Sequence, residues 1–232
     1  MGLIDPRVEW HNLRRTKPAV RHFARLEHTE SEDSMNFLRM DDCDDDKDEK
    51  KKDNGAMGHL LKTRTIVLAG QVDQEMAERV MSQLVILDTE NKEPIRVIVT
   101  SQGGHVDSGY AIHDMLRYVE SEVFCIGAGW VASIAVPILL GARKKENRVS
   151  LPNTRFLLHQ PSGGAGGQLQ DIRIEAQEIL KIREKVNQLI AKETGQKVEK
   201  VTADSDRNFW MSAEEAMKYG LISRIVTSAK EL

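Results

Sequence analysis

Residues 123–142 read Val-Phe-Cys-Ile-Gly-Ala-Gly-Trp-Val-Ala-Ser-Ile-Ala-Val-Pro-Ile-Leu-Leu-Gly-Ala, and this uncharged run carries the clearest indication of the fold. Its first four residues favour a β-strand, whereas residues 134–140 favour a helix. A run of this length could span a bilayer, but it contains several residues that break a membrane helix: Gly127, Gly129, Pro137 and Gly141. We therefore predict a strand, a glycine turn and a buried helix that begins near Ser133, rather than a membrane span.

Strands and helices alternate on both sides of this run. We expect strands at 65–70, 95–100, around Val149, 155–159 and 222–226. We expect helices at 74–87, 108–119 and 169–193, the last closed by Gly195, and a final helix with a Ser212 capping box and a Gly220 stop. This alternation predicts an α/β domain.

The first quarter of the chain differs from the rest. Residues 1–56 are polar, and residues 41–53 are almost entirely charged, so they cannot bury apolar surface. We expect 1–56 to be a disordered extension and 57–232 to be the folded domain. The acidic run does not match a calcium loop, because the required glycine and distal glutamate are missing. No spacing of His, Cys or carboxylate residues predicts a metal site, and nothing points to an organic cofactor.

Bulk composition limits the partners and the compartment. The net charge of −3 over 232 residues gives no electrostatic case for nucleic-acid or membrane binding. The only two cysteines, Cys43 and Cys125, lie in contrasting surroundings that do not suggest a disulfide framework. The amino terminus lacks the apolar core of a secretory signal. Together these features predict a protein of the reducing cytoplasm.

Three local features carry side chains or backbone groups suited to catalysis. Ser133 lies among small residues between a strand and a helix start, where backbone N–H groups are free to bind an oxyanion; an ordinary helix-capping serine is the alternative. Gly103 and Gly104 follow a strand and could bring backbone N–H groups close to a ligand, or form only a turn. His159 ends an apolar strand and could serve as the base for Ser133.

Two further histidines are less informative. His105 follows the glycine pair and could be a second base or a substrate contact. His113 falls on the polar side of its predicted helix, so we expect it to be exposed to solvent.

Together these motifs resemble the ClpP family of ATP-dependent serine peptidases, a branch of the crotonase-like fold. The resemblance covers about residues 60–227. It rests on segments that occur in the family's order: Thr100-Ser-Gln-Gly-Gly-His-Val106, Ala132-Ser-Ile-Ala135, Leu151-Pro-Asn-Thr-Arg-Phe-Leu-Leu-His-Gln-Pro161 and Trp210-Met-Ser-Ala-Glu-Glu-Ala-Met-Lys-Tyr-Gly-Leu221. It implies repeated ββα units, a long handle helix and assembly into rings.

The resemblance also implies roles for individual residues. It makes Ser133 the nucleophile, His159 the general base, and the N–H groups of Gly104 and Ile134 the oxyanion hole. Gly103 and Gln160 would flank an extended substrate strand. The implied function is endopeptidase cleavage of unfolded polypeptides inside stacked heptameric rings. A separate AAA+ unfoldase such as ClpX or ClpA would supply them, since this chain has no phosphate loop of its own.

The chain departs from the family pattern at the third member of the triad. Counting without gaps places Asn208 where the family has Asp, although Asp206 could serve if the loop shifts. An Asn can accept the His N–H bond but brings no charge to stabilise the imidazolium. Two alternatives therefore stay open: a weakly active or inactive structural subunit in a ring with a ClpP paralogue, and a crotonase-type acyl-CoA enzyme.

Overall fold

The computed structural model describes residues 55, 58–161 and 166–232. The predicted disordered extension, residues 1–56, lies outside these described residues except for Gly55. Within the described segments one sheet contains seven strands: β1 (Thr65–Val72), β2 (Ile95–Gly104), β3 (Val123–Ala132), β4 (Arg148–Ser150), β5 (Arg155–Leu158), β6 (Phe209–Met211) and β7 (Arg224–Ile225). The same segments contain the helices α2 (Gln74–Glu90), α3 (Val106–Tyr118), α4 (Ala135–Leu139), α5 (Leu169–Thr194), α6 (Val198–Asp204) and α7 (Ala213–Tyr219), and two 3-10 turns, η1 (Lys145–Asn147) and η2 (Ala229–Glu231).

The sheet is parallel except at one pair of strands. The order β1-β2-β3-β4-β7 is joined by parallel pairs, and β5 pairs parallel with β3 and antiparallel with β6. The first half of β3 pairs with β4, whereas its second half, from Trp130 to Ala132, pairs with β5. This change of partner lets β3 deliver the segment that follows Ala132 between β2 and β5.

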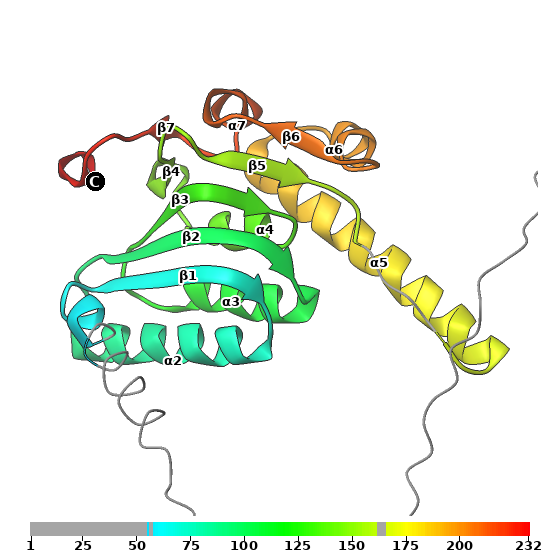
Figure 1. The fold of residues 1–232 in the computed structure, drawn as a ribbon, viewed down its shortest axis with the longest axis horizontal. Helices are drawn as coiled ribbons and strands as arrows, with labels where there is room; N and C mark the ends of the chain where they lie inside the picture. Colours follow the sequence, from blue (N-terminus) through cyan, green and yellow to red (C-terminus); the bar gives the residue numbers. More distant parts are fainter. Residues whose placement is uncertain (1–54, 56–57, 162–165) are drawn as a thin grey trace, which may run out of the picture. The chain divides into compact units, whose positions relative to one another are not determined.

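Two helices cover one face of the parallel strands. Figure 1 shows α2 and α3 side by side beneath β1 and β2, with α4 under β3. The face of α2 that meets the sheet carries Met76, Val80, Leu84 and Leu87, which are almost fully buried. Its Asp73 caps the first turn by accepting a hydrogen bond from the N–H of Met76 at 2.8 Å. An amphipathic stripe and a cap explain why this segment is a helix.

The long helix α5 is packed at one end only. Figure 1 shows it extending away from the sheet. Its last three turns bury Val186, Ile190 and Ala191, whereas Leu180 is 62% exposed and Ile174 is 56% exposed. Gly195 ends the helix in the left-handed conformation at φ 81°, as the sequence predicts. The exposed apolar half of α5 has no partner among the described residues.

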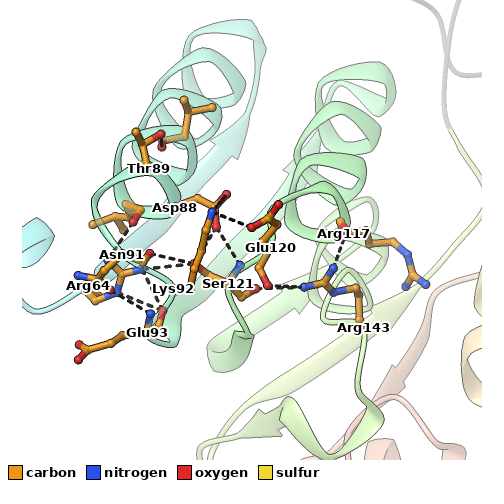
Figure 2. A network of polar contacts seen from close by, with 12 residues as sticks. Arg64, Asp88, Thr89, Asn91, Lys92, Glu93, Arg117, Glu120, Ser121 and Arg143 are labelled. Carbon is orange, nitrogen blue, oxygen red and sulfur yellow. Dashed lines mark hydrogen bonds and ion pairs between the residues drawn. The ribbon is translucent and has the colours of Figure 1, made fainter.

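A network of polar contacts lies at the amino ends of the strands β1, β2 and β3 (Figure 2). Arg64, itself in the left-handed region at φ 51°, is buried and donates to the carbonyls of Leu87 at 2.9 Å and Glu93 at 2.9 Å. The Asp88 carboxylate accepts from the N–H and hydroxyl of Ser121 at 2.8 and 2.7 Å. These bonds tie the carboxyl end of α2 to the connection that leads into β3.

The α/β prediction is confirmed, but three strands are longer than expected. β1 continues past Gly70 to Val72. β2 continues to Gly104, so the glycine pair belongs to the strand end and does not follow it. β3 continues through Gly127 and Gly129 to Ala132, and the predicted glycine turn is wrong. The physical reason is that a register shift between β2 and β3 absorbs these glycines without ending the pairing. The capping box of Ser212 and the stop at Gly220 are confirmed.

The prediction that His113 is exposed is wrong. Its side chain is only 4% exposed, because α4 packs across the side of α3 that carries it. The ring satisfies its polar character with a hydrogen bond to the Pro137 carbonyl at 2.7 Å.

Candidate active site

Parallel pairing brings the three candidate features to one edge of the sheet. β2 ends at Gly104, β3 at Ala132 and β5 at Leu158. Because β3 lies between β2 and β5, Ser133 emerges between the glycine pair and His159. The carboxyl ends of parallel strands are the usual location of binding sites in α/β sheets.

Ser133 occupies a sharp turn between β3 and α4. Its backbone is left-handed at φ 57°, a conformation that costs a non-glycine residue on the order of 1–3 kcal/mol. Its N–H donates to the Leu157 carbonyl, and its carbonyl accepts from the N–H of Val136, both at 3.0 Å. The turn is therefore held from both sides. Ser133 does not cap α4, since Ile134 holds that position and no side chain caps the helix.

The two glycines at the end of β2 pack closely against neighbouring backbone: Gly103 against the Ser133 turn and Gly104 against β1. Gly103 has φ 92°, and a Cβ placed on it would lie 2.6 Å from the Ser133 Cβ and 2.8 Å from the Ala132 carbonyl oxygen. Gly104 has φ 154°, and its Cβ would lie 2.1 Å from the Val72 carbonyl oxygen. Both positions require glycine for close approach of backbones. The glycine pair therefore does more than form a turn, because it allows neighbouring backbone segments to approach closely.

A cavity of about 20 Å³ joins Ser133 to His159, enough room for about one water molecule. Its walls are mostly apolar. The lining comprises Val106, Ser133, Ile134, Leu158, His159, Pro161, Val186, Asn187, Ile190 and Ser205. The structure thus brings together the predicted nucleophile, the predicted base and Ile134, one of the two predicted oxyanion residues.

Sequence reasoning missed Asn187 and Ser205, the two polar residues of this lining besides Ser133 and His159. The Ser205 hydroxyl donates to Asn187 Oδ1 at 3.1 Å, and Asn187 Nδ2 donates to the Thr202 hydroxyl at 3.2 Å. Because these groups satisfy one another, they add little polarity to the cavity, whose remaining lining apart from Ser133 and His159 is apolar. An Asn between the apolar positions Val186 and Ile190 of α5 was the signal that could have revealed it.

Both candidates for the third triad position lie beside His159. A second cavity, of about 670 Å³, is lined by His159, Gln160, Pro161, Ile179, Asp206, Arg207 and Asn208. The Asp206 carboxylate pairs with Arg183 at 3.2 Å, and the Asp206 carbonyl accepts from Gln160 Nε2 at 2.9 Å. Among the described residues, no hydrogen bond joins the His159 ring to Asn208 or Asp206. Asp206 is thus already engaged by α5, whereas the Asn208 side chain makes no hydrogen bond to any described residue.

His105 does not face the candidate site, although the sequence allowed it a role as a second base or a substrate contact. His105 caps α3: its Nδ1 lies 2.9 Å from the Ser108 hydroxyl, and its ring does not line the cavity of Ser133 and His159. α4 spans only five residues, so its macrodipole is small. An oxyanion at this turn would therefore meet individual backbone N–H groups, with little help from a helix dipole.

The described residues contain no group of three or more His, Cys, Asp or Glu side chains that could hold a metal ion. In the same described part of the chain, no helix is long and apolar enough to cross a membrane.

Known proteins resemble this chain over most of its length. The family model described as Clp protease matches residues 47–229. The chain is 49% identical over 193 residues to the ATP-dependent Clp protease proteolytic subunit 3 of Rhizobium johnstonii, covering 82% of this chain and 99% of that protein. It is 46% identical over 194 residues to proteolytic subunit 2 of Pseudomonas aeruginosa, covering 81% and 96%. Among solved structures, an asparagine-to-aspartate mutant of ClpP1 from Listeria monocytogenes matches with a TM-score of 0.70 and 44% identity, covering 75% of this chain and 98% of that one.

Proposed function

Because this chain belongs to the Clp protease family of serine peptidases, we propose that it cleaves unfolded polypeptides as an endopeptidase inside a ring-shaped chamber. The observation that carries the proposal is the turn of Ser133. Its left-handed backbone presents the hydroxyl at the edge of the sheet, in the same cavity as His159. The family assignment removes the support for the alternative of an acyl-CoA enzyme.

In the proposed mechanism Ser133 attacks the scissile carbonyl while His159 takes the hydroxyl proton. The N–H groups of Gly104 and Ile134 then stabilise the oxyanion. His159 returns the proton to the leaving amine, and water completes hydrolysis of the acyl-enzyme by the same steps. No metal or organic cofactor enters these steps.

The shape of the site supports an extended peptide with an apolar side chain. The cavity beside Ser133 is walled by Val106, Leu158, Val186 and Ile190, so an apolar residue before the scissile bond would gain free energy on burial. Gly103 lies at the end of β2, and Gln160 lies two residues after the end of β5, on the other side of β3. An extended substrate backbone could lie between these two segments.

Assembly and partners are part of the proposal. α5 leaves several large apolar side chains exposed, among them Ile174 and Leu180, and exposed apolar side chains gathered on one element are typical of a protein–protein contact. We assign them to contacts between stacked heptameric rings, formed by this chain alone or with a ClpP paralogue. An AAA+ unfoldase such as ClpX or ClpA would feed such rings in the cytoplasm.

A weakly active or inactive subunit remains the second candidate. It is favoured by Asn208, and by the absence of a hydrogen bond from a described residue to the His159 ring. In such a mixed ring, this chain would complete the chamber while the paralogue cleaves.

A serine-directed fluorophosphonate probe separates these candidates. We expect labelling of the wild-type chain at Ser133, none of Ser133→Ala, and unchanged labelling of Ser82→Ala, which removes an exposed hydroxyl from α2. Folded rings that resist the probe would favour the structural subunit. Labelling that survives Ser133→Ala would contradict the site assignment.

A further inference from the structure

The short helix α4 depends on its neighbours for its orientation. Its five residues begin two positions after Ser133, and a helix of this length is not stable by itself. One side of α3 runs along it. Near its start, a Cβ on Gly109 of α3 would lie 2.2 Å from the Ile134 side chain; near its end, a Cβ on Gly141 would lie 2.9 Å from Leu116.

Between these two contacts lies the carbonyl of Pro137, which the helix itself does not satisfy. Its regular donor would be the N–H of Gly141, but that group donates to the Ile138 carbonyl at 2.9 Å. The N–H of Leu140 donates to the Val136 carbonyl at 3.0 Å. Pro137 thus has a buried acceptor that needs a donor from elsewhere.

His113 supplies that donor from α3. Its Nδ1 lies 2.7 Å from the Pro137 oxygen, and its side chain is 4% exposed. Since a carbonyl only accepts hydrogen bonds, Nδ1 carries the proton and the ring is held in one tautomer. Burial lowers the pKa of His113, which keeps the ring neutral.

Charged groups around His113 anchor the same region. Arg117 lies one turn further along α3, and its guanidinium faces Glu193 of α5 at 3.5 Å. Glu193 also pairs with the buried Arg148 of β4, whose guanidinium donates to the Ala142 carbonyl at 2.8 and 3.0 Å. Arg117, Glu193 and Asp114 are the charged groups that act on the His113 ring. The carbonyl of Pro137 and that of Ala142, just after α4, are thus both held by side chains from other elements.

We propose that His113 is a positioning residue for the peptidase reaction, holding the nucleophile turn of Ser133 in place through its hydrogen bond to the Pro137 carbonyl. The inference rests on the proposed role of Ser133. The side chain acts through α4 and does not touch substrate. Losing the bond would let α4 shift within the core and move the Ser133 hydroxyl away from His159, and misplacement by about 1 Å can cost about a hundred-fold in rate.

Two variants distinguish positioning from simple core filling. In His113→Asn the side-chain amide nitrogen can occupy the place of Nδ1 and donate to Pro137. In His113→Leu the volume is largely kept but the donor is lost. We expect His113→Leu to lower kcat for a short fluorogenic peptide by about ten-fold or more with KM unchanged, and His113→Asn to recover most of the loss.

The kcat values of the His113 variants can also overturn the proposal. Equal kcat values for the Leu and Asn variants, whether normal or reduced, would show that the donor does not matter. If His113→Leu does not fold, His113→Gln takes its place. Its amide reaches the position of Nε2 and not Nδ1, so a Gln variant as active as the Asn variant would contradict the proposal.

Ser133→Ala, assayed in parallel, tests the proposed function separately. Turnover that persists in Ser133→Ala removes the nucleophile assignment itself. Loss of turnover in Ser133→Ala, together with normal kcat in His113→Leu, overturns only the positioning role.

Discussion

Gly103→Ala isolates the close contact between the glycine pair and the nucleophile turn. The added methyl group would lie 2.6 Å from the Ser133 Cβ, 2.8 Å from the Ala132 oxygen and 3.2 Å from the Ser133 hydroxyl oxygen. Carbon atoms normally pack no closer than about 3.5 Å. Relieving the overlap therefore requires a movement of about 1 Å, and the methyl group can move away only if Ser133 or β2 shifts.

Two terms contribute to the cost of this substitution. The left-handed backbone at φ 92° is unfavourable for alanine by about 1–2 kcal/mol. Displacing Ser133 by about 1 Å lowers the rate by on the order of a hundred-fold. The first term lowers stability, whereas the second lowers catalysis, so the two can be measured separately.

Gly70→Ala is the matched control. Gly70 has φ 90°, nearly the same as Gly103, but nothing lies within 4 Å of its added Cβ. It should lose similar backbone stability in urea unfolding and keep its turnover.

The assay is kcat/KM for a short fluorogenic peptide, together with the rate of fluorophosphonate labelling. We expect Gly103→Ala to lose about a hundred-fold in both, while Gly70→Ala stays near wild type. A Gly103→Ala protein that labels at the wild-type rate would refute the argument, because the contact would then have no influence on Ser133.

Asn208→Asp should raise kcat by about ten-fold or more, because the imidazolium formed during attack gains a counter-charge; if Asp206→Ala is instead the damaging change and Asn208→Asp has no effect, Asp206 orients the histidine. Leu180→Asp places a charge on the exposed apolar part of α5 and should dissociate the rings in sedimentation velocity, and intact stacked rings would count against α5 as the interface. Burial alone would raise the pKa of Asp88, but hydrogen bonds from the N–H and hydroxyl of Ser121 outweigh it and hold the pKa below the usual value. Because the folded-state pKa is lowered, Asp88 stabilises the fold above about pH 4 and loses this contribution as the pH falls further; Asp88→Asn should therefore unfold more easily at neutral pH, and its free energy of unfolding should depend less on pH below 4.

The sequence by itself determined the features that depend on neighbours along the chain. The stripe of α2, the capping box at Ser212 and the stop at Gly195 are local patterns, and the structure has all of them where the patterns predict. Ser133, Gly103 and His159 were identifiable because small residues and strand ends mark them, and because the motifs resemble a known family.

The tertiary structure alone decided how far the strands run and which side chains meet. β3 extends past its glycines because β2 and β5 offer it pairing partners, and these lie far away in the sequence. His113 is buried because α4 packs against a face of α3 that its own periodicity marks as polar. Asp206 is engaged by Arg183 of a distant helix, which no local pattern reveals. Such contacts form only when the whole sheet has assembled. At these positions, packing between distant segments outweighs the local conformational preference of the sequence.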